Sequence, residues 1–434
     1  MKALFIQPSH LMQDGKVFRS ARLPYPSLAL PLIAALTPKD FDCEIVNDYY
    51  EDIDYDAPCD VVAITAMTPQ VVRAYQIAEG FRKCGRHVVM GGFHVTMLPD
   101  EAKQHSDTII CGEAENTWPD FIDDFRTGKP RKAYKSKELV DISTLPTPRY
   151  DLLNRRGYSL RVWPVQTTRG CPRQCDFCSV TQFYGGSYRF RPLEHVVRDI
   201  QATHSRFITF IDDNIAANKR YCRKICEAIK PLKLTWGSQC NLNVAKDKDL
   251  LRQLSEAGCV ALFLGIESVN AASLASVNKE FNKIEEYAGY LQAIREAGIM
   301  PMASMIVGLD GDDERVFQAT YDFLVKNRVP IAYLFILTPG PGTRLFERLE
   351  KEGRILHKDW SRYGGDEVVF MPKQMSPETL EKGFWEILHR FYSLPGVFRR
   401  VIGTMPFSRR MIYNLKYNMI HHRSLKRHTH PLRG

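Results

Sequence analysis

Three cysteines stand close together in the sequence, Cys171, Cys175 and Cys178, with the spacing Cys-x3-Cys-x2-Cys. Cysteine thiolates hold iron-sulfur clusters, and a [4Fe-4S] cluster normally uses four of them. Three thiolates leave one iron without a protein ligand, and an open position distinguishes a catalytic metal site from a closed structural one. The spacing therefore predicts a [4Fe-4S] cluster whose open iron can chelate the amino and carboxylate groups of a small molecule such as S-adenosylmethionine.

A zinc site is the main alternative for these thiols. Zinc sites usually show paired Cys-x2-Cys or Cys/His spacings with a fourth ligand near in sequence, a place that His195 could take here. The position of the three cysteines, directly after an apolar run at 162–167, favours the iron-sulfur interpretation.

The elements that would position the cysteines form a repeating series. Six apolar runs of strand length are followed, for the first five, by helical patterns, and this alternation predicts a partial (β/α)6 barrel of the TIM type. The functional site of such a barrel lies at the carboxyl ends of its strands, where the cysteines stand. The predicted strands are 162–167, 207–211, 234–239, 261–265, 302–307 and 332–337, and the helices 193–200, 222–232, 249–257, 284–297 and 315–325.

A second series of strands and helices precedes the barrel. Its alternation predicts a parallel sheet covered on both faces, which is a doubly wound, Rossmann-like domain. We therefore expect a Rossmann-like domain at 1–140, a linker at 141–160, the barrel at 161–345 and a small helical, basic region at 346–434. The predicted strands of the first domain are 2–8, 43–46, 61–66, 88–90 and 108–110, and its clearest helices are 28–36 and 71–82.

Composition sets the class of protein. The chain has 434 residues, of which 44% are hydrophobic and 25% charged, as in a globular protein of two or three domains. No run is long enough to span a membrane, and the 11 cysteines suit a reducing compartment, so a cytoplasmic location is expected. Among the cysteines outside the motif, Cys43, Cys111, Cys240 and Cys259 are predicted to be small buried side chains.

The net charge of +9 comes from the C-terminal tail, so we expect no nucleic-acid partner. From residue 396 onward apolar residues alternate with nine basic residues and no acidic ones, a pattern typical of a helix on an anionic membrane or over an acidic substrate. A solvated helix packed on its own domain is the alternative, and peripheral membrane contact stays a hypothesis. The basic residues are Arg399, Arg400, Arg409, Arg410, Lys416, Arg423, Lys426, Arg427 and Arg433.

The cysteine motif resembles that of the radical S-adenosylmethionine superfamily, and the resemblance covers about 162–343. It implies that Phe177 lies beside bound S-adenosylmethionine. It also implies that polar groups at later strand ends hydrogen-bond the amino, ribose and adenine parts of this cofactor. These positions are Asp212, Asp213, Asn214, Gln239, Asn241, Gly265, Glu267, Ser268, Val307 and Gly308.

The domain before the barrel resembles that of the cobalamin-binding subfamily of radical enzymes. Ligands of open α/β sheets bind at the carboxyl ends of the strands, and glycine lets a flat macrocycle approach the backbone. The motif Asp-x-His-x-x-Gly, which supplies a histidine to cobalt in many cobalamin proteins, is absent, and His94 is an uncertain substitute. The cobalamin positions are Thr65, Met67, Thr68, Gly91, Gly92, His94, Gly112 and Glu113.

The resemblance implies a C-methyltransferase acting on an unactivated carbon. A 5′-deoxyadenosyl radical would remove hydrogen from the substrate, and methylcobalamin would supply the methyl group. Radical oxidation, cyclisation or rearrangement without methyl transfer remains an alternative, and a non-catalytic metal-binding regulator is a third. We expect a small acidic or hydrophobic substrate, such as a lipid or tetrapyrrole, and an electron donor such as flavodoxin or ferredoxin.

Overall fold

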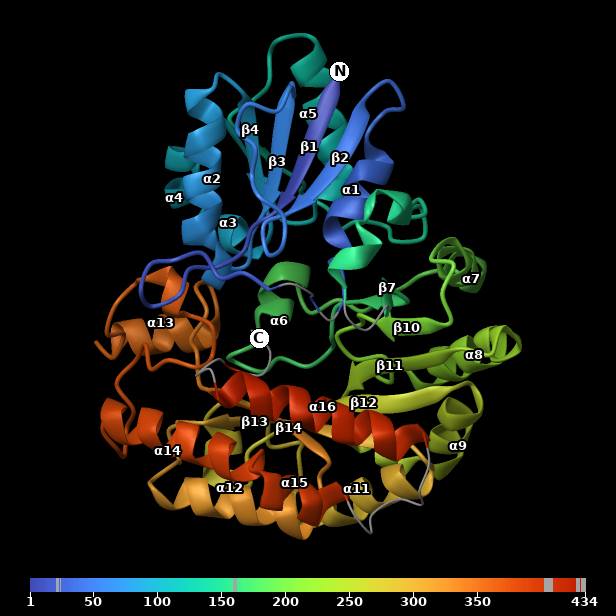
Figure 1. Cartoon of the computed structure of the whole chain (residues 1–434), viewed down its shortest axis with the longest axis vertical. Coiled ribbons are helices and arrows are strands. Elements are labelled where there is room, and N and C mark those ends of the chain that lie inside the picture. Colours follow the sequence, from blue (N-terminus) through green and yellow to red (C-terminus); the bar gives the residue numbers. More distant parts are fainter. Residues whose placement is uncertain (21–22, 24, 159–161, 402–408, 427–429, 431–434) are drawn as a thin grey trace.

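The computed structural model describes residues 1–20, 23, 25–158, 162–401, 409–426 and 430. Figure 1 shows an N-terminal α/β unit above a second, larger α/β unit, with the C-terminal helices along the lower front. The two sheets together account for the strand series expected from the sequence.

The N-terminal sheet has six parallel strands in the order β2-β1-β3-β4-β5-β6. Alternate residues of β1 point to opposite faces, so that Leu4 and Ile6 pack with α2 while Ala3 and Phe5 pack with α1 and α5. This is the doubly wound arrangement. The strands are β1 (Lys2–Gln7), β2 (Asp42–Asn47), β3 (Val61–Thr65), β4 (His87–Gly91), β5 (Thr108–Cys111) and β6 (Ala133–Lys135); the helices are α1 (Ala29–Leu36), α2 (Val71–Lys83), α3 (Phe93–Met97), α4 (Pro99–His105) and α5 (Trp118–Arg126).

The second sheet also has six parallel strands, in the order β7-β10-β11-β12-β13-β14. Alternate residues of its strands pack against the surrounding helices, whereas Gly237, Gln239, Phe263 and Gly265 between them are only half-buried. The unpacked face therefore lines an open interior, as in a partial barrel. The strands are β7 (Trp163–Val165), β10 (Phe207–Phe210), β11 (Thr235–Cys240), β12 (Cys259–Glu267), β13 (Met300–Val307) and β14 (Ile331–Ile336); the helices are α7 (Leu193–Ala202), α8 (Lys219–Ile229), α9 (Lys248–Glu256), α10 (Ala271–Ala275), α11 (Tyr287–Glu296) and α12 (Arg315–Lys326).

The predicted alternation is confirmed, with two local differences. A short antiparallel pair, β8 (Thr168–Arg169) and β9 (Arg189–Phe190), flanks the cysteine loop and the helix α6 (Ser179–Tyr184) after it. Strand β6 lies in a stretch with no clear sequence period, because a three-residue edge strand buries only Tyr134. Cys43, Cys111, Cys240 and Cys259 are buried, as predicted.

The C-terminal region closes the free edge of the barrel at β14. The hydroxyl of Tyr392 donates to Ala332 O (2.7 Å) and accepts from its N–H (3.2 Å), Asn418 donates to Pro330 O (3.2 Å), and His430 Nε2 contacts Leu334 O at 2.9 Å. These side chains satisfy edge groups that a seventh strand would otherwise pair. The helices are α13 (Arg344–Lys351), α14 (Pro377–Phe391), α15 (Leu394–Val401) and α16 (Arg409–Lys426).

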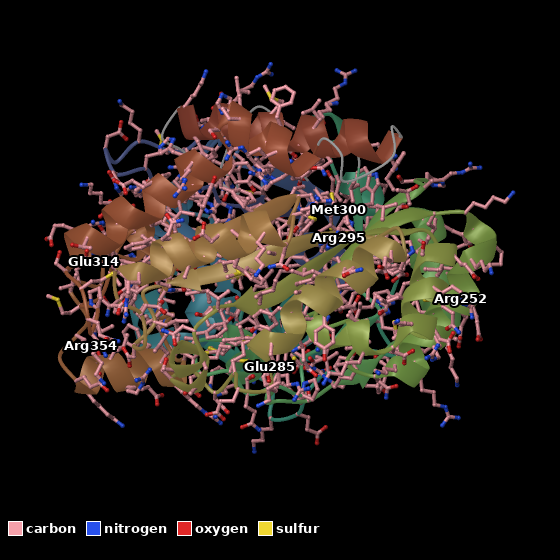
Figure 2. The ribbon with its side chains drawn as sticks, turned by 90° about the horizontal axis from the view of Figure 1, so that it is seen from below. Arg252, Glu285, Arg295, Met300, Glu314 and Arg354 are labelled. Atoms are coloured by element: carbon pink, nitrogen blue, oxygen red, sulfur yellow. The ribbon has the colours of Figure 1, made fainter. Side chains whose placement is uncertain are left out.

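Figure 2 shows this C-terminal layer from below, running along one side of the barrel helices. Within the described part of the chain, no helix is both long enough and apolar enough to cross a membrane.

Candidate active site

The cysteine loop leaves β8 at the carboxyl end of the first barrel strand and is held by its backbone. Asp176 N–H donates to Val277 O (3.1 Å), and Asp176 O accepts from Leu345 N–H (3.0 Å). Gly170 begins the loop at φ +91°, where an added Cβ would lie 2.1 Å from Ser187 O. The loop is therefore anchored to segments that follow the fourth and sixth barrel strands, and only glycine fits its first residue.

The three thiols share one electrostatic environment. Burial raises the pKa of Cys171 and Cys178, and it raises the pKa of Cys175 to about 11. Negative charge on the neighbouring sulfurs adds to this rise in the pKa of Cys175 and Cys178. Iron binds thiolates. A cluster held by the three sulfurs would therefore offset the cost of burying their negative charges and their repulsion of one another.

In the described ranges, no three His, Cys, Asp or Glu side chains converge tightly enough to bind a single metal ion. A cubane attaches each thiolate to a different iron, so its ligands need not converge on one point. The donor set on this loop, three thiols and no fourth, therefore fits a cluster with one open iron.

A buried ion pair lies beside the cysteine loop. Lys279 binds Glu267, and its ammonium lies 5.7 Å from the centre of the Phe177 ring. Glu267 has φ +67° and accepts from Ser304 Oγ at 3.2 Å. The charge of Lys279 also lowers the cost of a thiolate at Cys175. Glu267 is thus at the site, but its carboxylate is already engaged by a lysine that the sequence analysis did not single out.

The acidic residues after β10 hold the start of the cysteine loop. Asp212 Oδ1 accepts from the backbone and hydroxyl groups of Thr167 (3.1 and 2.9 Å) and from both groups of Thr168, whereas its Oδ2 has no partner among the described residues. Complete burial raises the pKa of Asp212 to about 6, although these donors oppose the rise. Asp213 accepts from Gly170 N–H at 2.9 Å. Both carboxylates therefore position the loop.

The remaining predicted S-adenosylmethionine positions fall into two groups. Gln239 and Gly265 line the barrel interior, where an added Cβ on Gly265 would lie 2.7 Å from a Glu267 oxygen. In the second group, polar groups serve strand ends: Asn214 accepts from Asn241 N–H (3.2 Å), the Asn241 side chain accepts from Asn243 N–H (3.0 Å), and Ser268 Oγ accepts from Asn270 N–H (3.0 Å).

The turn after β13 is organised by Asp312, another residue that the sequence analysis missed. Its Oδ2 accepts from Gly308 N–H and Leu309 N–H, each at 3.0 Å, and Ser273 donates to its other oxygen. Burial raises its pKa to about 6. Val307 is the last residue of β13. The Asp312 carboxylate therefore fixes the backbone that follows Val307, where a contact with S-adenosylmethionine was predicted at Val307 and Gly308. An acidic residue in Gly-Asp-Asp, shortly after a strand, was the available signal.

The predicted cobalamin positions lie at the carboxyl edge of the N-terminal sheet. Met67 is 51% exposed there, and Gly112 has φ +80° with open space around it. Gly92 has φ +100°, and an added Cβ would lie 2.8 Å from Thr65 Oγ1 and 2.9 Å from Ala66 O. The edge therefore combines close backbone packing with an exposed apolar side chain.

His94 is a correction. Its side chain is fully buried, Nδ1 contacts Thr68 Oγ1 at 3.3 Å, and Nε2 contacts Glu101 Oε1 at 3.2 Å. The ring packs edge-on against Trp360. Because both nitrogens are engaged inside the domain, the ring is not available to cobalt, and the same contacts occupy Thr68. His94 is therefore a structural hydrogen-bonding residue.

Glu113 also has a different role from the one expected. It accepts from both Nη atoms of Arg189 at 2.9 Å and from Arg169 Nη1 at 2.7 Å, and Glu115 pairs with the same Arg169 nitrogen at 2.7 Å. All four side chains are largely buried. Although burial opposes it, the two arginines lower the pKa of Glu113. This ion-pair network joins the N-terminal sheet to the residues on either side of the cysteine loop.

The two strand edges face each other. In Figure 1, β1 runs downward from the labelled N-terminus, so the carboxyl end of its sheet faces the barrel, and α6 lies between the two units. Phe93 on α3 contacts Phe183 on α6 with ring centres 6.2 Å apart. Met97 fills the space beside Gly342, which follows the sixth barrel strand. Groups held at the two edges would therefore share one space beside the cysteine loop.

Comparisons with known proteins agree with this arrangement. The radical SAM superfamily domain matches residues 165–324, the B12 binding domain matches residues 16–122, and a domain of unknown function, DUF4070, matches residues 343–424. The cobalamin-dependent S-adenosylmethionine radical enzyme OxsB has a similar fold, with a TM-score of 0.67 and 15% identity over 98% of this chain and 72% of that one.

Curated relatives extend the similarity to nearly the full length. The chain is 31% identical to bacteriochlorophyllide d C-12(1)-methyltransferase of Chlorobaculum tepidum, over 93% of this chain and 90% of the relative. It is 27% identical to the C-8(2)-methyltransferase of the same organism, over 92% and 94% of the two chains. The chain belongs to the cobalamin-binding radical S-adenosylmethionine enzymes, in the family that contains these methyltransferases.

Proposed function

We propose that this chain, a cobalamin-dependent radical S-adenosylmethionine C-methyltransferase, methylates a tetrapyrrole of the bacteriochlorophyllide class at an unactivated carbon. The observation that carries the proposal is the opposition of the two strand edges across the cysteine loop. Hydrogen removal and methyl delivery must reach one substrate carbon, and only a space shared by both edges allows this. The tetrapyrrole class is supported by two relatives of almost equal length that act on bacteriochlorophyllide d.

When bound, the cluster supplies the electron that splits S-adenosylmethionine, and cobalamin supplies the methyl group. We assign Cys171, Cys175 and Cys178 as the cluster ligands. Gln239, on the half-buried interior face of the barrel, is the predicted position best placed to contact S-adenosylmethionine directly, and Gly265 on the same face makes room for the Glu267–Lys279 pair. Asp212 and the other buried acids act instead by holding loop backbone in place.

At the N-terminal edge, the glycines and the exposed thioether suit a flat macrocycle. Gly112 has open space beside it, Gly91 and Gly92 pack closely against neighbouring strands and loops, and Met67 presents apolar surface. With His94 engaged elsewhere, and no Asp-x-His-x-x-Gly motif, we infer that cobalamin binds here without a histidine from this segment.

The electron donor would be an acidic one-electron carrier such as flavodoxin or ferredoxin. Arg173 is exposed on the cysteine loop, and Arg344 is half-exposed beside it, where it donates to Gln174 Oε1 at 3.1 Å. These two guanidinium groups offer a cationic approach to the cluster position.

The test is anaerobic turnover of the reconstituted protein with bacteriochlorophyllide d, S-adenosylmethionine and dithionite. We expect a product heavier by one methylene, with 5′-deoxyadenosine and S-adenosylhomocysteine formed in similar amounts. Deoxyadenosine without the homocysteine product would indicate the alternative, a radical oxidation or cyclisation, and would refute methyl transfer. If methylation and deoxyadenosine formation occur only with a different acceptor, such as a polycyclic lipid, the proposed reaction stands and the proposed tetrapyrrole substrate is refuted.

A further inference from the structure

The two last helices present an outward face with unusual chemistry. Phe398 on α15 is 51% exposed, and Leu394 lies four residues earlier on the same side of that helix. On α16, Lys416, Ile420 and Arg423 are spaced by four and three residues, so they share one face, with Leu415 and Lys426 adjoining it. We call Leu394, Phe398, Leu415, Lys416, Ile420, Arg423 and Lys426 the C-terminal basic face.

Among the described side chains of α16, the buried ones are mostly polar, with Leu425 the apolar exception, whereas an ordinary surface helix buries an apolar stripe. Asn418 donates to Pro330 O and to Asn414 Oδ1, and it accepts from Arg400, which is itself buried over the Phe391 ring. His421 is buried against Tyr333, Tyr392 and Tyr417. Polar contacts thus help to fix the helix to the barrel edge, while Leu415 and Ile420 point outward and are not covered by any part of the chain that the structure describes.

The basic side chains of this face have no ion-pair partner in the part of the chain that the structure describes. The sequence contains no acidic residue after Glu386. Among the described residues, Arg399, Lys416, Arg423 and Lys426 form no ion pair, and no acidic side chain of the tail could supply one; some exposed basic residues of the barrel helices are paired, as Arg252 is with Glu256 at 3.0 Å. Of the nine basic residues in the tail, Arg427 and Arg433 lie outside the described residues, as do the side chains of Arg409 and Arg410.

A hollow opens within the same surface. A cavity of about 360 Å³ lies between the end of α14, the start of α15 and the end of α16, and its lining includes Leu394, His422 and Lys426. It therefore combines an apolar wall with a cationic one. A lipid headgroup with its phosphate presents the matching chemistry.

We propose that the C-terminal basic face docks on an anionic lipid bilayer, with Phe398, Leu415 and Ile420 in the interface and the basic side chains against lipid phosphates. Apolar residues interleaved with basic ones suit an anionic bilayer, because the apolar side chains gain by burial among the lipids and the basic ones by attraction to lipid phosphates. This assigns a role to the region that matches a domain of unknown function. It is independent of which carbon the enzyme methylates.

The experiment is co-sedimentation of the reconstituted full chain with vesicles of phosphatidylglycerol and, in parallel, of phosphatidylcholine. We expect the chain to sediment with phosphatidylglycerol vesicles, and the bound fraction to fall as salt is raised. Replacing Lys416, Arg423 and Lys426 together by Gln should weaken binding about a hundredfold, since each charge is worth about fivefold. Phe398→Ser should weaken binding without changing its salt dependence.

The matched control removes three positive charges elsewhere, by Lys230→Gln, Arg252→Gln and Arg315→Gln; Figure 2 labels Arg252 on α9, away from the C-terminal helices. This variant should sediment like the parent chain. Equal loss in the control would mean that only net charge matters, and equal binding to both lipids, or none, would overturn the proposal. Iron content and circular dichroism of every variant establish that it is folded, and deoxyadenosine production is followed separately, so loss of docking and loss of catalysis are distinguished.

Discussion

The two strand edges that meet at the cysteine loop carry different kinds of residue. The barrel edge holds buried charge: the carboxylates of Asp212 and Asp312 and the ion pair of Glu267 with Lys279. The N-terminal edge has glycines and the exposed Met67. Its buried acids Glu113 and Glu115 form ion pairs with Arg169 of the barrel. The barrel edge therefore suits a small charged cofactor, and the N-terminal edge suits a broad flat one.

The largest effect should follow from removing a thiol at the barrel edge. In Cys175→Ala the cluster has only two ligands, so we expect 5′-deoxyadenosine formation to fall to background while cobalamin binding stays unchanged. Iron analysis, cobalamin spectra and product chromatography measure the three quantities. Cys84→Ala, at an exposed cysteine, is the control. Loss of both the cluster and cobalamin in Cys175→Ala would contradict the assignment of the two cofactors to separate edges.

The next effect concerns the ion pairs that join the edges. Arg169→Ala leaves Glu113 and Glu115 buried with one cation fewer, and stranding a buried charge costs about 3–5 kcal/mol of unfolding free energy. Chemical denaturation of the apoprotein measures it. Arg126→Ala breaks an exposed pair with Asp40 in the same domain and should cost much less, because solvent screens an exposed pair. Similar costs for the two variants would mean that the joint between the domains is not buried in solution.

A third prediction concerns the buried carboxylate of Asp212. Its pKa is about 6 in the folded protein against an ordinary 3.8, so the unfolded chain holds fewer protons between these values. Its contribution to stability is therefore complete below pH about 4 and is lost as pH rises to about 6, by about 3 kcal/mol.

Asp212→Asn removes this titration. We expect the stability difference between Asp212→Asn and the parent chain to shift in favour of the variant across the same pH interval, in urea unfolding at several pH values. The control is Asp313→Asn, at a residue whose pKa is lowered by Arg315. A pH-independent difference for Asp212→Asn would show that this carboxylate is ionised throughout.

The smallest effect belongs to the N-terminal edge. Gly92→Ala places a Cβ against Thr65 and Ala66 at a positive φ, which should cost about 2–3 kcal/mol and weaken cobalamin binding. Gly15→Ala has a similar φ but open space, and should cost about 1 kcal/mol without affecting cobalamin. Spectroscopic titration with cobalamin compares them. Unchanged affinity in Gly92→Ala would remove this edge from the cobalamin site.

Much of the fold could be predicted because its signals are local. All six barrel strands and five of the six N-terminal strands were found within a few residues, since apolar runs of strand length alternate with helical periods. The partners of the predicted site residues were not found. Arg169 and Glu113 are separated by 56 residues, and nothing in either segment indicates the other. Lys279 was missed because it meets Glu267, twelve residues earlier, only in the folded chain. Asp312 differs, since it binds Gly308 and Leu309 three and four residues before it, and its local signal in Gly-Asp-Asp went unused.

The cysteine motif and the order of two parallel α/β units could be predicted from the sequence, because they depend on short spacings and on hydrophobic period. The cobalamin-dependent radical family came from the resemblance of these segments to known enzymes. The roles of three residues became clear from the folded structure: His94 is buried and structural, Glu113 joins the domains, and Asn418 binds the edge of the barrel from the inner side of α16. The reason is that a polar side chain takes its role from the groups around it. Burial and partners are set by chain segments far away in the sequence, which local patterns do not encode.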